Sequence, residues 1–201
     1  MAKMKNLEDF LMDELKDIYS SEKQITKALP KMAKAATSPE LKETFLNHLK
    51  ETENQITRLE KISKLAGGRS LSGKKCVATE GLLEEGKELM EEDATPEVMD
   101  VALICAAQKV EHYEIATYGC AATYARLLGY TEVEELLNET LEEEKNADIT
   151  LSTIADELNP EAMNGESDSD DSSISGKKSS SKRTASKGSS KGKKSSAKSR
   201  K

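Results

Sequence analysis

The sequence predicts an all-α protein: a bundle of four long helices, with a long crossover that contains a short extra helix. Three observations support this fold class. The 201 residues are 36% hydrophobic and 33% charged, with no Trp and two Phe, which suits amphipathic helices better than a sheet. Apolar residues recur at steps of three and four along four long segments. The connections between these segments are short, long and short, as in a bundle with one crossover.

The first helix is predicted over about residues 5–35. One face carries apolar residues at alternating steps of four and three, with a single acid, Glu22, among them. That face consists of Leu11, Leu15, Ile18, Glu22, Ile25, Leu29 and Met32. Pro30 lies inside the pattern and predicts a kink in the last turns.

The second helix is predicted over about residues 39–66, with Ser38 as its N-cap and Gly67 at its end. Its inner face is apolar at both ends and polar in the middle. That face consists of Leu41, Phe45, His48, Thr52, Gln55, Leu59 and Ile62. Glu51 flanks the polar middle, one turn after His48.

Residues 67–95 form the crossover, and a short helix is predicted over about residues 79–92. The third long helix follows over about residues 96–128. Its inner face has Glu111 at the centre of apolar positions, and Glu114 lies one turn further on. A buried carboxylate is unfavourable unless it is protonated, paired or bound to a metal, so these two acids need a reason.

The fourth helix is predicted over about residues 131–158. It begins with a capping box at Thr131 and ends before Pro160. Its inner face is apolar on both sides of two acids, Glu144 and Asp148. Acids therefore interrupt the apolar pattern of three long helices near the middle, and an acid flanks the polar middle of the second helix.

These acids are predicted to lie at a similar depth along the bundle axis. With a rise of about 1.5 Å per residue and antiparallel hairpins, six of them fall within roughly one helical turn of depth. They are Glu22, Glu51, Glu111, Glu114, Glu144 and Asp148. Multivalent cations would relieve their repulsion, and oxygen-rich sites suit iron or manganese. His48 is the seventh predicted metal ligand and would supply a nitrogen donor. Alternatively, His48 forms a hydrogen bond to one of the ligands and does not contact the metal itself.

Four segments together resemble the YciE/YciF-type ferritin-like stress proteins. These segments are residues 13–24, 48–53, 109–118 and 142–148. The resemblance covers about residues 5–158 and implies a ferritin-like, rubrerythrin-like bundle, a homodimer and a carboxylate-bridged site for two iron or manganese ions.

The sequence departs from the usual ferritin-like pattern, which carries Glu-x-x-His on two helices. Here Glu51 is followed by Asn54, and Glu144 is followed by Asp148 without a histidine. A site so poor in nitrogen leaves three options open: weak binding, one ion rather than two, or a preference for manganese. The sequence assigns no catalytic residue.

The formal charge of −7 divides unevenly along the chain. Residues 176–201 hold eleven Lys and Arg and no acid, whereas residues 1–175 hold 19 basic and 37 acidic residues. We therefore predict a bundle domain over residues 1–159 and a disordered tail over residues 160–201, acidic over 161–175 and basic from residue 176. The basic part is suited to contact with the nucleic-acid backbone or another acidic surface.

Three functions agree with these patterns. The first is a stress-response protein with a di-iron or di-manganese site, and, if it is an enzyme, an oxidoreductase that reduces peroxide or dioxygen. The second is a non-enzymatic protein whose basic tail binds nucleic acid, with the bundle as a structural dimer. The third is a metal-free bundle whose buried acids share protons.

The remaining patterns concern the compartment. Three cysteines, Cys76, Cys105 and Cys120, do not form a disulfide framework and indicate free thiols in a reducing compartment. Residues 1–5 lead into a polar helix rather than an apolar signal segment. No apolar run approaches the length of a membrane span. The sequence therefore predicts a cytoplasmic protein that does not contact a membrane.

Overall fold

The computed structural model describes residues 4–163. All regular elements in that range are helices: α1 (Leu7–Ala35), α2 (Pro39–Leu65), α3 (Val77–Glu91), α4 (Pro96–Leu127) and α5 (Thr131–Met163). This confirms the predicted all-α bundle, with α3 as the short helix of the crossover. The predicted tail lies outside the described residues, except for residues 160–163, which continue α5.

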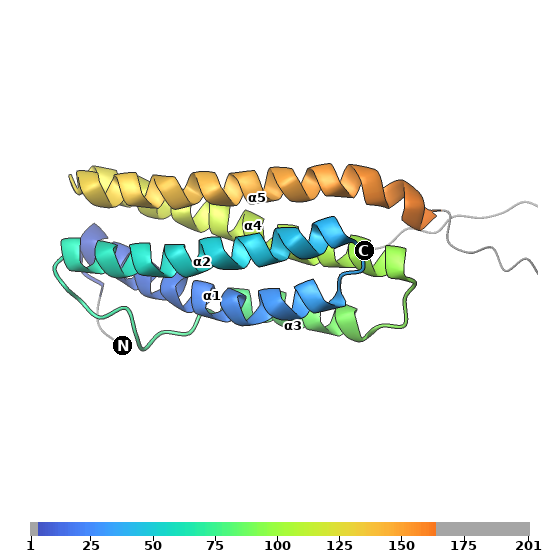
Figure 1. Cartoon of the computed structure of the whole chain (residues 1–201). Coiled ribbons are helices and arrows are strands. Elements are labelled where there is room, and N and C mark those ends of the chain that lie inside the picture. Colours follow the sequence, from blue (N-terminus) through green and yellow to red (C-terminus); the bar gives the residue numbers. More distant parts are fainter. Residues whose placement is uncertain (1–3, 164–201) are drawn as a thin grey trace, which may run out of the picture. The chain divides into compact units, whose positions relative to one another are not determined.

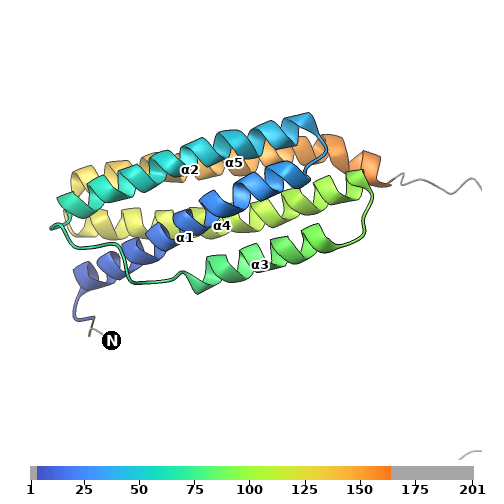
Figure 2. The ribbon, with the colours of Figure 1, turned by 60° about the horizontal axis from the view of Figure 1, so that its bottom comes forward.

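The path of the chain follows from the lengths of its connections. Figure 1 shows α1 and α2 as one antiparallel hairpin and α4 and α5 as a second. The crossover returns along the bundle, so α2 and α4 run in the same direction. Figure 2 shows α3 on the outside of the bundle, where it packs on α1 and α4. Within residues 4–163, no helix combines the length and apolar character needed to cross a bilayer.

Local signals in the sequence set most helix ends. The side chain of Ser38 accepts a hydrogen bond from the backbone N–H of Leu41, as expected for an N-cap, and Thr95 caps α4 in the same way. Gly67 and Gly129 follow α2 and α4 with φ angles of 94° and 74°, a region that glycine adopts without strain.

The last helix differs from the prediction at its end. It begins at Thr131 as predicted, but its expected end near Leu158 is wrong, because the helix continues through Pro160 to Met163. Proline removes one backbone hydrogen bond and crowds the preceding turn, but residues 161–163 (Glu-Ala-Met) favour helix and extend it. Figure 1 shows the end of α5 bending away from the line of the helix.

Asp100 ties the first hairpin to the start of α4. Its carboxylate is 3% exposed and accepts hydrogen bonds from the backbone N–H groups of Thr37 and Ser38, both at 2.8 Å. The hydroxyl of Thr37 donates a third bond at 2.6 Å. A carboxylate is a strong acceptor, so this contact fixes the turn between α1 and α2 against the second hairpin.

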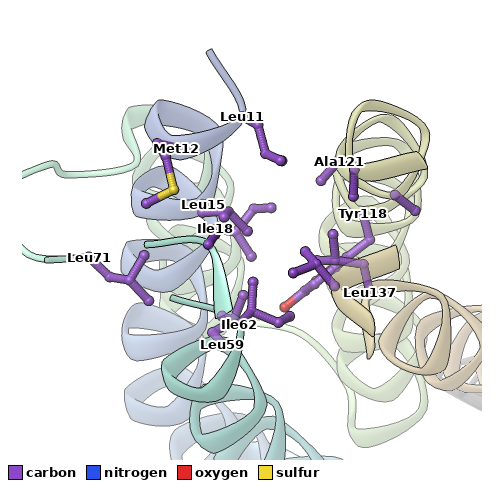
Figure 3. Packing of buried hydrophobic residues seen from close by; sticks show 14 residues of the cluster. Leu11, Met12, Leu15, Ile18, Leu59, Ile62, Leu71, Tyr118, Ala121 and Leu137 are labelled. Carbon is purple, nitrogen blue, oxygen red and sulfur yellow. The ribbon is translucent and has the colours of Figure 1, made fainter. Parts of the chain in front are cut away.

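Apolar side chains form two clusters, one toward each end of the bundle, and each cluster draws on all four long helices. The first includes Leu15, Leu59, Tyr118 and Leu137, shown in Figure 3. The second includes Ile25, Phe45, Leu103 and Leu151. Between the clusters lies a set of buried polar side chains, called the polar layer below. The polar layer consists of Glu22, His48, Thr52, Gln55, Glu111, Glu114 and Glu144.

Candidate metal centre

Four members of the polar layer converge in the middle of the bundle. They are His48 from α2, Glu111 and Glu114 from α4, and Glu144 from α5. Each offers one ligand atom, and these atoms all lie within 4.8 Å of one another. All four side chains are buried. Helical periodicity places them there, because each lies on the same face of its helix as the buried apolar residues.

His48 faces two of the acids with its inner nitrogen. Its Nε2 lies 3.4 Å from Oε1 of Glu111 and 3.7 Å from Oε2 of Glu144. Its outer nitrogen, Nδ1, lies 3.4 Å from Oε2 of Glu51. The imidazole therefore separates a carboxylate near the surface from the buried pair.

Glu22 supplies a fifth buried group from α1. It is completely buried, and the hydroxyl of Tyr118 donates a hydrogen bond to its Oε1. Burial raises the pKa of Glu22, and the charge of Glu144 raises it further, so the two carboxylates lie within electrostatic reach of each other. The sequence pattern placed Glu22 correctly in the interior.

Three carboxylate oxygens in this cluster have no hydrogen-bond partner among the described residues. They are Oε2 of Glu22, Oε2 of Glu111 and Oε2 of Glu144. A buried polar atom without a partner is costly, and such atoms are rare in native proteins. Several in one place fit a cation, and a set of carboxylates with one imidazole suits iron or manganese.

The pKa values show how the cluster balances its charge without a cation. Burial, followed by the charge of Glu144, raises the pKa of Glu22 to about 8. Burial also raises the pKa values of Glu111 and Glu114 well above their usual range, and neighbouring carboxylates add to the effect. Burial lowers the pKa of His48, but the surrounding carboxylates, Glu111 first, outweigh it and raise that pKa to about 10. The metal-free centre therefore holds protons near neutral pH.

Polar neighbours hold Glu144 in place. The side-chain N–H of Gln55 donates to Oε1 of Glu144 and, at 3.1 Å, to Oε2 of Glu143. Arg58 donates to both oxygens of Glu143 at 2.8 Å. One oxygen of Glu144 is thus fixed by an amide while the other faces His48. Gln55 occupies a seam position in the sequence, but its bond to Glu144 depends on tertiary packing.

The structure does not bring the predicted ligands Glu51 and Asp148 into the buried cluster. The side chain of Glu51 is 50% exposed, and that of Asp148 is 22% exposed. Asp148 instead accepts a hydrogen bond from Gln108 at 3.1 Å and lies 3.2 Å from Nε2 of the exposed His112. Successive residues are rotated by about 100° around the helix axis. A side chain three or four residues away from an inward-facing one therefore points tens of degrees away from the inward direction.

Hydroxyl groups connect the crossover to the centre. The hydroxyl of Ser21 donates to Oε1 of Glu114 at 3.4 Å and shares a hydrogen bond of 2.6 Å with the hydroxyl of Thr79 in α3. The hydroxyl oxygen of Thr79 also lies 3.3 Å from Sγ of Cys76. Cys76, Cys105 and Cys120 are all free thiols, as predicted, and Cys76 is buried. The crossover thus closes one side of the polar layer.

Known proteins resemble this chain over most of its length. A family model described as "Domain of unknown function (DUF892)" matches residues 6–164. Protein YciF of Escherichia coli (strain K12) is 48% identical over 162 residues, which span 80% of this chain and 98% of YciF.

Solved structures show the same relationship. The crystal structure of the E. coli stress protein YciF matches with a TM-score of 0.76 and covers 78% of this chain and 99% of that chain. YcfI from Rhodopseudomonas palustris is 43% identical, with a TM-score of 0.73, over 75% of this chain and 96% of that one. A protein from Xanthomonas campestris at 21% identity shares the fold, with a TM-score of 0.61 over 79% of this chain and 95% of that one.

Proposed function

This chain belongs to the DUF892 family, and we propose that it is a stress-response protein that binds iron or manganese inside its helical bundle. The observation that carries the proposal is the convergence of His48, Glu111, Glu114 and Glu144, in which Oε2 of Glu111 and Oε2 of Glu144 make no hydrogen bond. The sequence similarity to a protein described as a stress protein supports the physiological setting.

Five residues of the polar layer would hold the ions. His48, Glu111, Glu114 and Glu144 form the compact set, and Glu22 lies beside it. Their oxygen-rich donors accommodate one ion or a carboxylate-bridged pair. Bound iron or manganese would supply redox chemistry toward peroxide or dioxygen. The protein itself excludes bulk water and fixes Glu144 through Gln55.

Elemental analysis of protein purified without added metal tests this function. We expect one or two iron or manganese ions per chain, lost in a Glu111→Gln/Glu144→Gln variant, because that change removes two donors while keeping side-chain volume. Glu142→Gln, an exposed change on α5, is the control and should keep the metal. Absence of metal from the wild type, even after anaerobic loading with Fe²⁺ and Mn²⁺, would refute the proposal.

If the protein is an enzyme, the rate of peroxide consumption should rise and fall with the metal content of these proteins.

A second function rests on the separation of charge along the sequence. The eleven Lys and Arg of residues 176–201 contrast with the acidic remainder, and cations clustered without acids attract the phosphate backbone. We propose that this basic segment binds nucleic acid without reading its bases, because it contains no aromatic residue for stacking.

Truncation separates this function from metal binding. A chain ending at residue 175 lacks the basic segment, and a chain ending at residue 163 lacks both tail segments while keeping α5 whole. Both should lose most DNA binding, and both should keep the metal content of the full chain. The binding of the full chain should fall steeply with salt. Undiminished binding by the 175-residue chain would show that the basic segment is not the contact.

A further inference from the structure

A pocket between α2 and α5 leads from the surface toward the candidate metal centre. Its volume is about 260 Å³, and it is lined by exposed side chains of both helices. Asn47 and Glu51 come from α2, and Glu143 and Asn146 come from α5. His48 also lines it and is 5% exposed, so it forms the inner end of the pocket.

The chemistry of this pocket differs from that of the other surface pockets. Its carboxylates, amides and hydroxyls offer oxygen atoms, and no Lys or Arg lines it. Each of the other three described pockets is lined by at least two Lys or Arg side chains, and none is lined by a residue of the four-residue cluster. Among these four pockets, this one alone reaches the four-residue cluster, and the exposed carboxylate of Glu51 lines it.

His48 stands at the boundary between the pocket and the centre. On the outer side its Nδ1 faces Glu51, and on the inner side its Nε2 faces Glu111 and Glu144. These contacts measure 3.4 to 3.7 Å, longer than ordinary nitrogen–oxygen hydrogen bonds. Oε2 of Glu144 lies directly behind the ring, 3.7 Å from Nε2, and makes no hydrogen bond.

We propose that this pocket is the port through which divalent cations load the buried centre. Glu51 captures the cation at the mouth, with the amide oxygen of Asn146 beside it. The imidazole of His48 turns aside, and the cation passes to the carboxylates behind it. Arg58 donates to both oxygens of Glu143, which leaves Glu51 as the pocket carboxylate open to the cation. In this assignment, which rests on the proposed metal-binding function, Glu51 governs the rate of loading rather than the amount of metal held.

Stopped-flow uptake of Mn²⁺ under anaerobic conditions, in competition with a fluorescent chelator, tests the port. An Asn146→Lys variant places a cation in the mouth and should slow uptake about tenfold at low salt, in the range that electrostatic focusing provides. Asn138→Lys makes the same exposed change on α5 outside the pocket and should load like the wild type. Glu51→Gln should also load slowly. At saturating Mn²⁺ all four proteins should hold equal amounts of metal.

Salt dependence separates an electrostatic effect from a structural one. Higher ionic strength should lower the rate of Mn²⁺ uptake by the wild type and reduce the difference in rate between the wild type and Asn146→Lys. The reason is that salt screens the charges at the mouth of the pocket. Equal uptake rates for Asn146→Lys and Asn138→Lys would overturn the port, and a reduced metal content in Glu51→Gln would make Glu51 a ligand instead. Absence of both Mn²⁺ and Fe²⁺ from the wild type at equilibrium would refute the metal site itself, so the two failures are distinct.

Discussion

Fe²⁺ or Mn²⁺ should raise the melting temperature of the metal-free protein by about 10 °C at concentrations near a thousand times the dissociation constant. Binding to the folded state alone contributes about 4 kcal/mol at that excess. For a chain of this size, 1 kcal/mol shifts the melting temperature by about 2–4 °C. The cation replaces the protons that now balance Glu22, Glu111 and Glu114, so the shift should be larger at pH 7.5 than at pH 5.5.

Differential scanning calorimetry with and without a chelator measures this shift. The Glu111→Gln/Glu144→Gln variant is the matched control and should melt at the same temperature in both conditions. If the wild type carries metal by elemental analysis but its melting temperature ignores the chelator, the ions sit on the surface and not in the polar layer.

Without metal, the protein should lose stability as pH rises from about 5 to 9. The folded-state pKa values of Glu22, Glu111 and Glu114 are raised above the ordinary value of 4.5, so the folded protein keeps protons that the unfolded chain releases. Their contribution is fully present below pH 4.5 and is lost as pH rises, for Glu22 through about 8. His48 acts in the same direction between 6.5 and about 10, since its protonated form is favoured by folding.

Glu114→Gln should therefore stabilise the metal-free protein at pH 8 by on the order of 2 kcal/mol, as neutral replacements of buried charges often do. It should also flatten the dependence of stability on pH, and it should weaken metal binding. Urea denaturation with chelator at pH 5.5 and 8.5 gives both quantities. Glu142→Gln, on the exposed face of α5, should leave both unchanged. A metal-free wild type that gains stability across this range would contradict the protonated centre.

The sequence predicted the part of this structure that helical periodicity controls. Glu22, Glu111 and Glu144 break apolar seams, and counting the rise per residue was enough to bring them to one depth. Periodicity alone could not resolve the last tens of degrees around a helix. Glu51 and Asp148, each one turn from a buried ligand candidate, therefore point outward rather than into the layer.

Other features depend on which helix meets which, and no pattern along the chain contains that information. Asp100 lies in the first turns of α4, and only the packed bundle brings it to the backbone of Thr37. The bond from Gln55 to Glu144 crosses from α2 to α5 in the same way. The pocket that ends at His48 arises where the surfaces of α2 and α5 face each other, so it also appears only in three dimensions.

The division of the apolar interior by the polar layer bears on how the bundle opens. Each of the two clusters contains side chains from all four long helices, so either end can stay packed while the other separates. As pH rises and the acids of the metal-free layer lose their protons, repulsion among them weakens the connection between the ends. On the proposed function, a cation held jointly by α2, α4 and α5 restores that connection. The supply of iron or manganese would then set whether the protein unfolds as one cooperative unit or as two.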